Sequence, residues 1–408
     1  MFDSSRIVVG LDLGTSKVCA VVVEIAESGA LNVIGLGQAK SRGVRKGEIV
    51  NVEHTMQDIR DALAAAEEMS DREIQSVYLG VTGGHVRSFN NRGFHPVASV
   101  DREIMVDDVQ DVLKNARALN LPGENKVLHL IRQQFLVDGE STQVQPIGRF
   151  GARLEVDFHV IHGSLNRLQT PIRVVKSLQI EVEDVVFNGL GSALACLNSH
   201  QKEVGTIVID MGAGSTEYLL YSGGVARHSG VIAVGGDHIS NDLAYGLKVP
   251  LGRAEQLKLD HGGAVVEPEI RGHTIALTND HGLPDRTINL EHLRRIMGLR
   301  IEEIFQLILQ DFDRAGVLHE ARGGVVLTGG GSRIPNIEKL ASQVFEMPAS
   351  RGRTTWISGD KSQLDQPEFA TAFGIVRFAS FDVKKRTAAQ QGFASRLSGK
   401  LANLLRLN

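Results

Sequence analysis

The sequence has few residues for covalent stabilisation and no long apolar run. Its two cysteines, Cys19 and Cys196, are far apart, and each lies among small and apolar residues. Two such thiols predict neither a disulfide framework nor a metal site, and they fit a reducing compartment. No segment approaches the roughly 18 consecutive apolar residues of a membrane-spanning helix, and the N-terminus lacks the apolar core of a signal peptide. We therefore expect a cytoplasmic protein with, at most, peripheral membrane contact.

The chain also has no strong excess of charge of one sign. Its net charge is −4 over 408 residues, of which 42% are hydrophobic and 23% charged. This composition is ordinary for a globular protein, and we expect no nucleic-acid partner because no overall positive charge attracts one. At roughly 150 residues per domain, the length predicts two to four domains.

Two parts of the chain, about 200 residues apart, repeat the same order of elements, as in an internal duplication. Each has three predicted strands followed by a helix, and their ranges are 7–12, 17–25, 31–38 and 52–69 in the first part, and 206–210, 218–221, 225–234 and 237–246 in the second. In both parts the first strand ends in Asp, followed by Gly and hydroxyl residues. The repeat predicts two similar α/β domains that face each other.

The turn after each first strand has the residues of a phosphate-binding hairpin. These residues are Asp12, Gly14, Thr15, Ser16 and Lys17 in the first turn, and Asp210, Gly212, Ala213, Gly214, Ser215 and Thr216 in the second. Glycine lets backbone N–H groups approach an anion closely, while hydroxyls and an ammonium add donors. Asp12 and Asp210 are placed to hold the water shell of Mg²⁺. One such turn alone is also compatible with an ordinary hairpin, but the pair predicts one nucleotide between two domains.

A third glycine-rich turn follows the predicted buried strand 325–328. It contains Gly329, Gly330 and Gly331, with Ser332 and Ile334 directly after them. Three glycines let a flat base or ribose lie against the backbone. The Pro-Asn pair at 335–336 is typical of a helix N-terminus.

These three motifs, in this order, are similar to those of the superfamily of actin, sugar kinases and heat-shock chaperones. Further segments resemble the FtsA family of bacterial cell-division proteins: 43–51, 127–129, 234–244 and 254–258. The resemblance implies a duplicated actin-like (ribonuclease H-like) α/β fold with ATP and Mg²⁺ as cofactors. It also implies nucleotide contacts from Gly236, Glu255 and Lys258.

The chain between the two repeats predicts an inserted α+β subdomain. Extended runs at 85–90, 127–135 and 153–161 surround a predicted helix at 106–118. The main pattern resumes with a helix at 164–178, for which Ser164 is the predicted N-cap. By resemblance, this subdomain (IC) contacts neighbouring copies and later division proteins, and a purely stabilising insertion is the alternative.

The resemblance divides the chain as follows: domain IA at 1–83 and 162–200, IC at 84–161, IIA at 201–226 and 301–381, IIB at 227–300, a linker at 382–391 and a membrane-targeting amphipathic helix at 392–408.

The C-terminal segment has an amphipathic pattern. At about 100° per residue, one face carries apolar side chains, which are Phe393, Leu397, Leu401, Leu404 and Leu405. Three basic residues accompany them, namely Arg396, Lys400 and Arg406, and each attracts anionic lipid by about 1 kcal/mol near the surface. The helix is too short and too charged to span a bilayer, so we expect it to lie in the interface. Docking on the protein's own core is the alternative.

By resemblance, the C-terminal peptide of FtsZ binds subdomain IIB near Arg286 and Arg300, beside a predicted helix at 299–312, although a solvated basic face is the alternative. The implied function is an ATP-binding protein that polymerises on the inner face of the cytoplasmic membrane at the septum. There it would tether FtsZ filaments and recruit later division proteins. A PilM-like protein of type IV pilus assembly, which shares the fold, is the alternative.

The sequence predicts slow or absent ATP hydrolysis. Ala213 stands where the family usually has Gly, and Ser215 where Thr is commoner. No residue is identifiable as the one that positions water for in-line attack, and His159, His162 and His228 are interpreted as structural. A sugar kinase or exopolyphosphatase would need a catalytic carboxylate in the cleft, for which Glu217 is the nearest spare acid.

Overall fold

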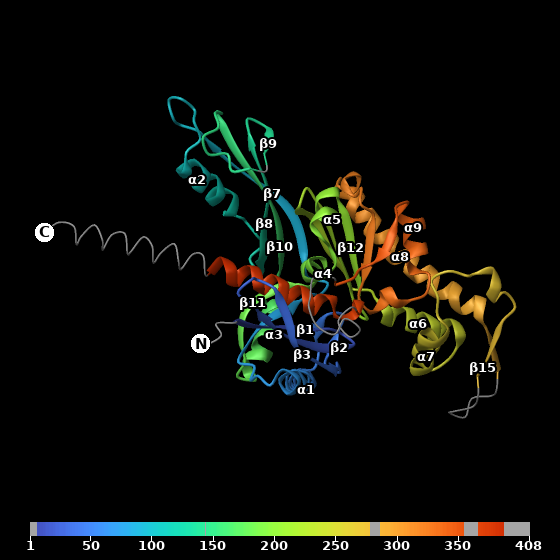
Figure 1. Cartoon of the computed structure of the whole chain (residues 1–408). Helices are drawn as coiled ribbons and strands as arrows, with labels where there is room; N and C mark the ends of the chain where they lie inside the picture. Colours follow the sequence, from blue (N-terminus) through green and yellow to red (C-terminus); the bar gives the residue numbers. More distant parts are fainter. Residues whose placement is uncertain (1–5, 143, 278–285, 355–365, 387–408) are drawn as a thin grey trace.

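The computed structural model describes residues 6–142, 144–277, 286–354 and 366–386. Two α/β halves lie side by side, and an inserted sheet projects from them (Figure 1). Each half is built on a five-stranded mixed sheet, in the order β11-β6-β1-β2-β3 in the first half and β14-β13-β12-β17-β18 in the second. In both sheets an antiparallel hairpin is followed by a third antiparallel strand and flanked by parallel strands. The predicted duplication is therefore confirmed in the topology.

Nearly continuous runs of apolar residues bury the central strands of the first half in its core. Its strands are β1 (Arg6–Leu13), β2 (Lys17–Ile25), β3 (Leu31–Lys40), β4 (Val44–Arg45), β5 (Glu48–Ile49), β6 (Ser76–Val81) and β11 (Glu181–Phe187), and its helices are α1 (Val52–Ser70), α3 (Leu165–Ser177) and α4 (Asn188–Cys196). Helix α1 begins at a cap in which Asn51 Oδ1 accepts from the His54 N–H at 2.9 Å, which satisfies a free donor of the first turn. Its buried face, with Ile59 and Leu63, packs in the core below β1 and β2.

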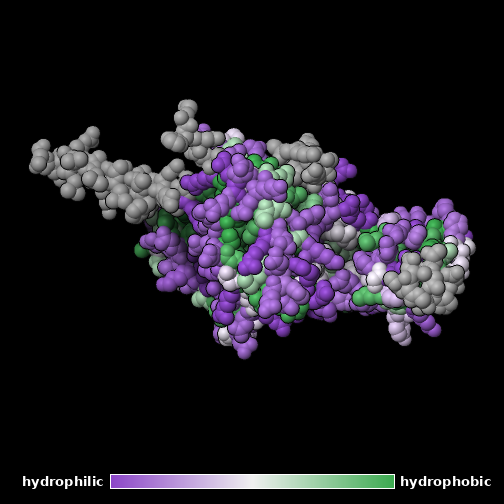
Figure 2. All heavy atoms as spheres, turned by 90° about the horizontal axis from the view of Figure 1, so that it is seen from below, coloured by the Kyte–Doolittle hydropathy of each residue, from purple (hydrophilic) through white to green (hydrophobic). Residues whose placement is uncertain are grey.

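The second half continues the chain with five sheet strands and a helical lobe. Its strands are β12 (Thr206–Met211), β13 (Thr216–Ser222), β14 (Val225–Ile232), β15 (Thr274–Leu277), β16 (Arg286–Asn289), β17 (Val325–Thr328) and β18 (Ala349–Arg351), and its helices are α5 (Ser199–Val204), α6 (Gly236–Leu247), α7 (Leu251–His261), α8 (Leu290–Arg314) and α9 (Ile337–Phe345). Short 3₁₀ turns are found at Pro268–Ile270, Leu318–Glu320, Gly330–Arg333 and Pro367–Phe369. Figure 2, which views the molecule from the side of α1, shows a mainly hydrophilic face with hydrophobic residues in small, separate groups.

The insertion is a four-stranded antiparallel sheet with one helix packed on it. Its strands are β7 (Arg87–Pro96), β8 (Asn125–Val137), β9 (Glu140–Thr142) and β10 (Arg153–Ser164), in the order β7-β10-β8-β9, and its helix is α2 (Val106–Arg117). Its own core includes Val112, Phe135 and Leu154.

Side chains of the insertion form hydrogen bonds with β14 of the second half. Ser88 Oγ donates to the Ser229 carbonyl at 2.6 Å, and Gln133 Nε2 to the Ala226 carbonyl at 2.9 Å. Asn90 Nδ2 donates to the Arg227 carbonyl at 3.1 Å. The insertion therefore contacts the second half directly, although its chain enters and leaves through the first.

A helix at residues 370–386 crosses between the two halves and lies against α4 (Figure 1). The contact is so close that a Cβ atom at Gly374 would overlap the backbone of Gly191. The buried face of the 370–386 helix includes Phe373 and Ile375. It packs in a core to which β1 of the first sheet and β12 of the second sheet both contribute. This helix pair thus joins the two halves.

Ser164 occupies the predicted N-cap position of α3, although its side chain forms no capping hydrogen bond. Two other details of the predicted elements were wrong. The helix predicted at 299–312 begins at Leu290, because Asn289 Oδ1 caps it by accepting from the His292 N–H at 3.1 Å. Residues 382–386, assigned to a linker, continue the 370–386 helix, since Tyr78 donates to Asp382 at 3.0 Å and Arg386 pairs with Glu183 at 3.2 Å.

Candidate functional site

A cleft of about 590 Å³ lies between the two halves. Three turns open into it: the β1–β2 turn, the β12–β13 turn and the glycine turn after β17. The strands before the second and third turns end side by side because β12 and β17 are parallel, with Asp210 opposite Thr328. The first turn follows β1 of the other sheet. Strands of this kind deliver the residues at their carboxyl ends to one edge of a sheet.

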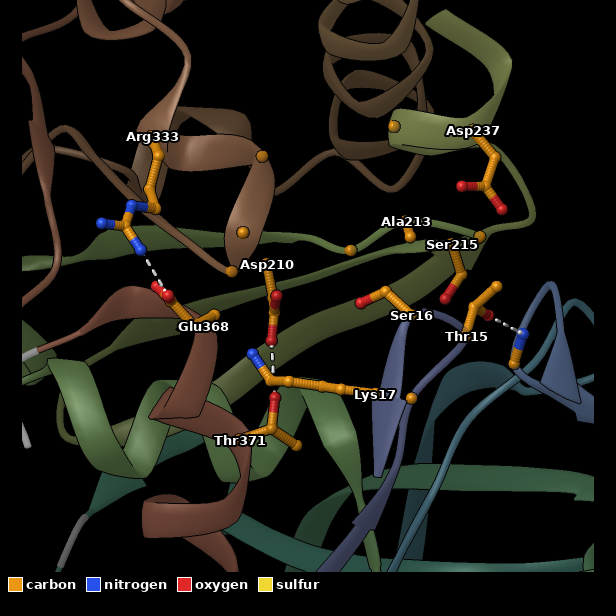
Figure 3. Close-up of a pocket in the computed structure, with 18 of the residues that line it drawn as sticks. Thr15, Ser16, Lys17, Asp210, Ala213, Ser215, Asp237, Arg333, Glu368 and Thr371 are labelled. Atoms are coloured by element: carbon orange, nitrogen blue, oxygen red, sulfur yellow. Dashed lines mark hydrogen bonds and ion pairs between the residues drawn. The ribbon is translucent and has the colours of Figure 1, made fainter. Parts of the chain in front are cut away.

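The two hairpin turns approach each other across the cleft. Thr15 Oγ1 accepts from the Gly47 N–H at 3.1 Å (Figure 3). A Cβ atom at Gly214 would overlap Thr15 Oγ1 and would lie 2.7 Å from the Lys46 nitrogen. Glycine is required at 214 for this approach, and its backbone faces the hydroxyl of the opposite turn.

Most residues predicted for the nucleotide line this cleft. They are Asp12, Gly14, Thr15, Ser16, Lys17, Asp210, Gly212, Ala213, Gly214, Ser215, Gly236, Glu255, Lys258, Gly329, Gly330, Gly331 and Ile334. Thr216 and Ser332 do not line it. Each is fully buried and donates its hydroxyl to a backbone carbonyl, Thr216 to Val234 and Ser332 to Gly329, both at 2.8 Å.

Three carboxylates are buried at the base of the cleft. Asn188 Nδ2 donates to Asp12 Oδ1 at 3.0 Å, and Thr371 Oγ1 donates to Asp210 Oδ2 at 2.8 Å (Figure 3). Ser192 also donates to Asp210. Burial, and then the charge of Asp210, raises the pKa of Asp12 to about 6, and burial raises the pKa of Asp210. A cation bound here would relieve this repulsion.

Glu217 is the third of these carboxylates, and it connects the halves. Ser215 Oγ, from the turn before β13, donates to Glu217 Oε1 at 2.7 Å, and Thr82 of the first half donates to the same oxygen. Burial and the nearby Asp210 raise the pKa of Glu217 to about 8. The surroundings of Glu217 therefore favour its protonated form.

Lys17 supplies a cation on the wall formed by the first half. Its Nζ lies 4.7 Å from the centroid of the Phe369 ring. Burial lowers its pKa, while Asp12, Asp210 and Glu368 act in the opposite direction.

Sequence reasoning missed several residues of the cleft. They are Gly47, Thr82, Asn188, Asp237, Leu259, Arg333, Pro335, Glu368 and Thr371, together with Glu217, which was singled out only for its acidity. Arg333 and Glu368 form an ion pair that joins the glycine turn to the segment before the 370–386 helix (Figure 3). Arg333 and Pro335 lie within the third motif but were assigned no contact there. The others lie outside the three motifs, which therefore gave no signal for them.

The far rim of the cleft is formed by α6 and α7. Lys258 Nζ donates to the Gly236 carbonyl at 3.1 Å and pairs with Glu255 Oε2 at 2.7 Å. Asp237, at the first turn of α6, has a pKa that burial raises. The predicted contacts of Gly236, Glu255 and Lys258 therefore lie together on one side of the cleft.

The two arginines predicted to contact a peptide lie outside the cleft. Arg286 begins β16, and its backbone pairs with Leu277 of β15. The Arg300 guanidinium forms two bonds with Asp242, at 2.5 and 3.0 Å, and also pairs with Glu303. These carboxylates hold Arg300 on the surface of the helical lobe.

Two of the three histidines have structural hydrogen bonds. His159 is fully buried, with Nδ1 2.8 Å from Asn90 Oδ1 and Nε2 2.8 Å from Ser229 Oγ, and burial lowers its pKa to about 3. His228 lies 2.6 Å from Asp311. His162 packs edge-on against Phe89. All three are removed from the cleft lining.

The predicted membrane segment 392–408 lies outside the described residues. Among the helices that the structure describes, none combines the length and apolarity needed to cross a bilayer. In the same residues, no three His, Cys, Asp or Glu side chains are grouped to hold a metal ion.

Two facing α/β halves with a glycine-lined cleft define an actin-like protein. Among solved structures, the fold is similar to that in the PilM–PilN type IV pilus biogenesis complex, with a TM-score of 0.62, 15% identity and coverage of 91% of this chain and 98% of that chain. It is also similar to MreB5 of Spiroplasma citri bound to ADP, with a TM-score of 0.56, 16% identity and coverage of 94% and 98%.

Sequence comparison then decides the family. The model of cell division protein FtsA matches residues 207–374, and that of the SHS2 domain inserted in FtsA matches residues 83–162. The chain is 34% identical to cell division protein FtsA of Pseudomonas aeruginosa over 92% of this chain and 90% of that protein. The FtsA protein of Borreliella burgdorferi is 34% identical, with coverage of 98% of each chain, and that of Escherichia coli K12 is 29% identical, with coverage of 95% of each chain. This chain belongs to the FtsA family of actin-like cell-division proteins.

Proposed function

We propose that this cell-division protein binds ATP and Mg²⁺ in the cleft between its halves and, in that state, self-associates into filaments on the inner face of the cytoplasmic membrane. There it attaches FtsZ filaments at the septum. The convergence of two duplicated turns and one glycine turn on a single cleft supports the nucleotide site. Its volume of about 590 Å³ lies within the range of ligand pockets.

Each wall of the cleft suits one part of the nucleotide. The hydroxyls of Thr15 and Ser16 and the Lys17 ammonium suit phosphates, together with the backbone of 212–215. The glycines at 329–331, with Glu255 and Lys258 opposite, suit the adenosine. The carboxylates of Asp12 and Asp210 are the hard oxygen donors that fit hydrated Mg²⁺, which would screen the phosphate charge.

Lys17 tests the phosphate assignment. We expect Lys17→Ala to weaken binding of a fluorescent ATP analogue about tenfold or more, because a charge-assisted bond to phosphate is lost. Lys40 is the matched control, since it pairs with Lys17 across the β2–β3 ladder but is exposed and outside the cleft. Equal loss in Lys17→Ala and Lys40→Ala would contradict this assignment.

Glu217 explains why hydrolysis by this chain should be slow. A protonated carboxyl cannot accept a proton from attacking water, and the oxygen facing Ser215 and Thr82 is already hydrogen-bonded. Phosphate release should therefore be low at pH 7 and rise as the pH passes about 8. If the rate of phosphate release does not change with pH and is the same in Glu217→Gln, Glu217 has no role in hydrolysis.

The C-terminal residues and the helical lobe supply the two attachments. We propose that 392–408 lies in the membrane interface and that the FtsZ C-terminal peptide docks near Arg286 and Arg300. Co-sedimentation of FtsZ with anionic liposomes should require the intact chain, and removal of 392–408 should abolish it. If the chain pellets without FtsZ, the anchor stands and the partner assignment fails; if neither pellets in the presence of ATP, both fail.

Arg300 sharpens the partner test, because Asp242 occupies its guanidinium. Arg300→Ala should weaken binding of the FtsZ peptide. Arg294 lies on the same helix and pairs with Glu267 at 3.0 Å, and Arg294→Ala should leave peptide binding unchanged. Asp242→Asn removes one of the two carboxylates that hold Arg300, the other being Glu303, and should leave binding of the peptide equal or stronger.

For the insertion, we propose contacts with neighbouring copies and later division proteins. Its support is a set of exposed apolar side chains on residues 94–150, including Phe94 and Phe150 at 64% and 68% exposure. We also propose the division into IA, IC, IIA and IIB given above. The pilus alternative rests on a shared fold at 15% identity, and the family match favours cell division over it.

A further inference from the structure

A second cavity lies away from the nucleotide cleft. Its volume is about 640 Å³, and it is formed by the end of α4, by α5, by the chain around β18 and by the 370–386 helix. Helix α4 bonds the cleft carboxylates through Asn188 and Ser192 and reaches this cavity at Cys196. The 370–386 helix contributes Thr371 to the cleft and Arg377 to the cavity. The two sites are therefore at opposite ends of one helix pair.

The lining of this cavity is cationic. Lys202, Arg351, Arg353 and Arg377 line it, and among the described residues no Asp or Glu does. Arg351 forms an ion pair at 2.8 Å with Glu338, which lies outside the lining. The remaining polar lining side chains, such as Asn198, Ser199 and Gln201, are neutral hydrogen-bonding groups. This cavity therefore selects for negative charge.

Two of these cations are partly buried and are held in place by aromatic rings. Lys202 Nζ lies 5.1 Å from the Tyr221 ring centroid, and the Arg377 guanidinium lies 4.9 Å from that of Phe381. Burial lowers the pKa of Lys202, and the neighbouring charge of Arg377 lowers it further. Burial also lowers the pKa of Arg377. The charge of Arg377 therefore disfavours the charged form of Lys202, an effect that an anion bound beside Lys202 would offset.

The types of these cations indicate the chemistry of the anion. Guanidinium groups bind phosphate through paired, planar N–H donors, and an ammonium adds a compact charge. Two or more such groups with neutral donors around them match a doubly charged oxyanion better than a single carboxylate. The cavity's volume leaves space for a substituent on the phosphate.

We propose that this cavity is a second anion site, which binds a phosphate-bearing small molecule or headgroup through Lys202, Arg377 and Arg353. The site stands independently of ATP binding in the cleft, because none of its lining residues is shared with the cleft.

Calorimetric titration of the full chain with inorganic pyrophosphate tests the proposal. Lys202→Gln/Arg377→Gln should weaken binding at this site about tenfold or more, while Arg377→Lys should restore part of it. Lys385→Gln is the matched control, because Lys385 is an exposed cation on the same 370–386 helix outside the cavity. Lys17→Ala, which alters the cleft alone, should leave this binding event unchanged. Thermal unfolding of each variant shows whether the fold is retained.

The source of the phosphate is decided by the same titration with inorganic phosphate and with glycerol phosphate. Tighter binding of glycerol phosphate, lost in Lys202→Gln/Arg377→Gln, assigns a lipid headgroup, whereas equal or tighter binding of inorganic phosphate assigns a soluble anion. Absence of pyrophosphate binding in the Lys17→Ala chain overturns the proposal. So does binding that the Lys17→Ala chain retains at full strength after Lys202→Gln/Arg377→Gln is added, or that Arg353→Glu leaves unchanged in the same background.

Discussion

The contact between α4 and the 370–386 helix predicts that Gly374 cannot be enlarged by one methyl group. A Cβ at this position would overlap the carbonyl and the Cα of Gly191, which are backbone atoms. A flexible side chain could rotate away from such a clash, but a helix backbone moves only as a unit. Gly374→Ala therefore forces the two helices apart, and they are the elements that join the halves.

The magnitude follows from two opposing effects. Replacing Gly by Ala inside a helix stabilises it by about 1 kcal/mol. Overpacking a tight contact costs ~1–3 kcal/mol, and more where the backbone must shift. Because every close neighbour is backbone, we expect a value at or above the upper end, and hence a net loss of roughly 2 kcal/mol or more in the free energy of unfolding.

Two matched Gly→Ala substitutions make the test quantitative. At Gly191 the nearest atom to a new Cβ is the Thr371 carbonyl oxygen at 3.2 Å, and at Gly252 in α7 nothing lies within 4 Å. Urea unfolding of the three variants should give the order Gly374→Ala, Gly191→Ala, Gly252→Ala from least to most stable. An unchanged urea midpoint for Gly374→Ala, or a lower stability for Gly252→Ala, would refute the reasoning.

Further predictions concern buried groups. The pKa of Glu217 is raised from 4.5 in the unfolded chain to about 8 in the folded protein. Between these pH values, unfolding therefore releases a proton from Glu217. Its contribution to stability is therefore lost as the pH rises through this window, and Glu217→Gln should flatten that part of a pH series of urea midpoints. His129 and His159 act in the opposite direction. Burial lowers their pKa values from 6.5 to about 4 and about 3. The free energy of unfolding should therefore decrease as the pH falls below 6.5, and this decrease should be smaller in His159→Gln. Gln133→Ala should cost about 1–3 kcal/mol, because it leaves buried polar groups unpaired, and should speed amide exchange in β8 and β14. Gln134→Ala is its control, since that side chain bonds Asp157 at 3.0 Å within the insertion and not β14.

Much of the fold was predictable because its information is local. Apolar strands that end in Asp, with Gly two residues later, mark both β1–β2 and β12–β13, and the structure places both turns in one cleft. Thr216 shows the limit of such a motif, since alternate residues of a strand face opposite sides. Ser215 and Glu217 face the cleft, whereas Thr216 between them donates to Val234 behind the sheet.

The remaining cleft residues depend on long-range packing. Thr371 reaches Asp210, 161 positions away in sequence, only because the 370–386 helix lies on α4. Arg333 and Glu368 meet for the same reason. No spacing in the sequence encodes such pairs. The length of α8 was underestimated because buried Leu293 and Met297 of its first turns are interleaved with His292, Arg294 and Arg295, which give this stretch the composition of a polar surface.

The insertion contacts β14 mainly through the main chain of that strand. Ser88, Asn90 and Gln133 all donate to main-chain carbonyls, at Ser229, Arg227 and Ala226. Ser229 is the exception, because its hydroxyl also lies 2.8 Å from His159 Nε2 of the insertion. Substitutions elsewhere in β14 leave these carbonyls in place, whereas a single-residue insertion or deletion would shift their register relative to their donors. Over evolutionary time these main-chain contacts should therefore tolerate changes of residue type outside Ser229 and resist changes of length.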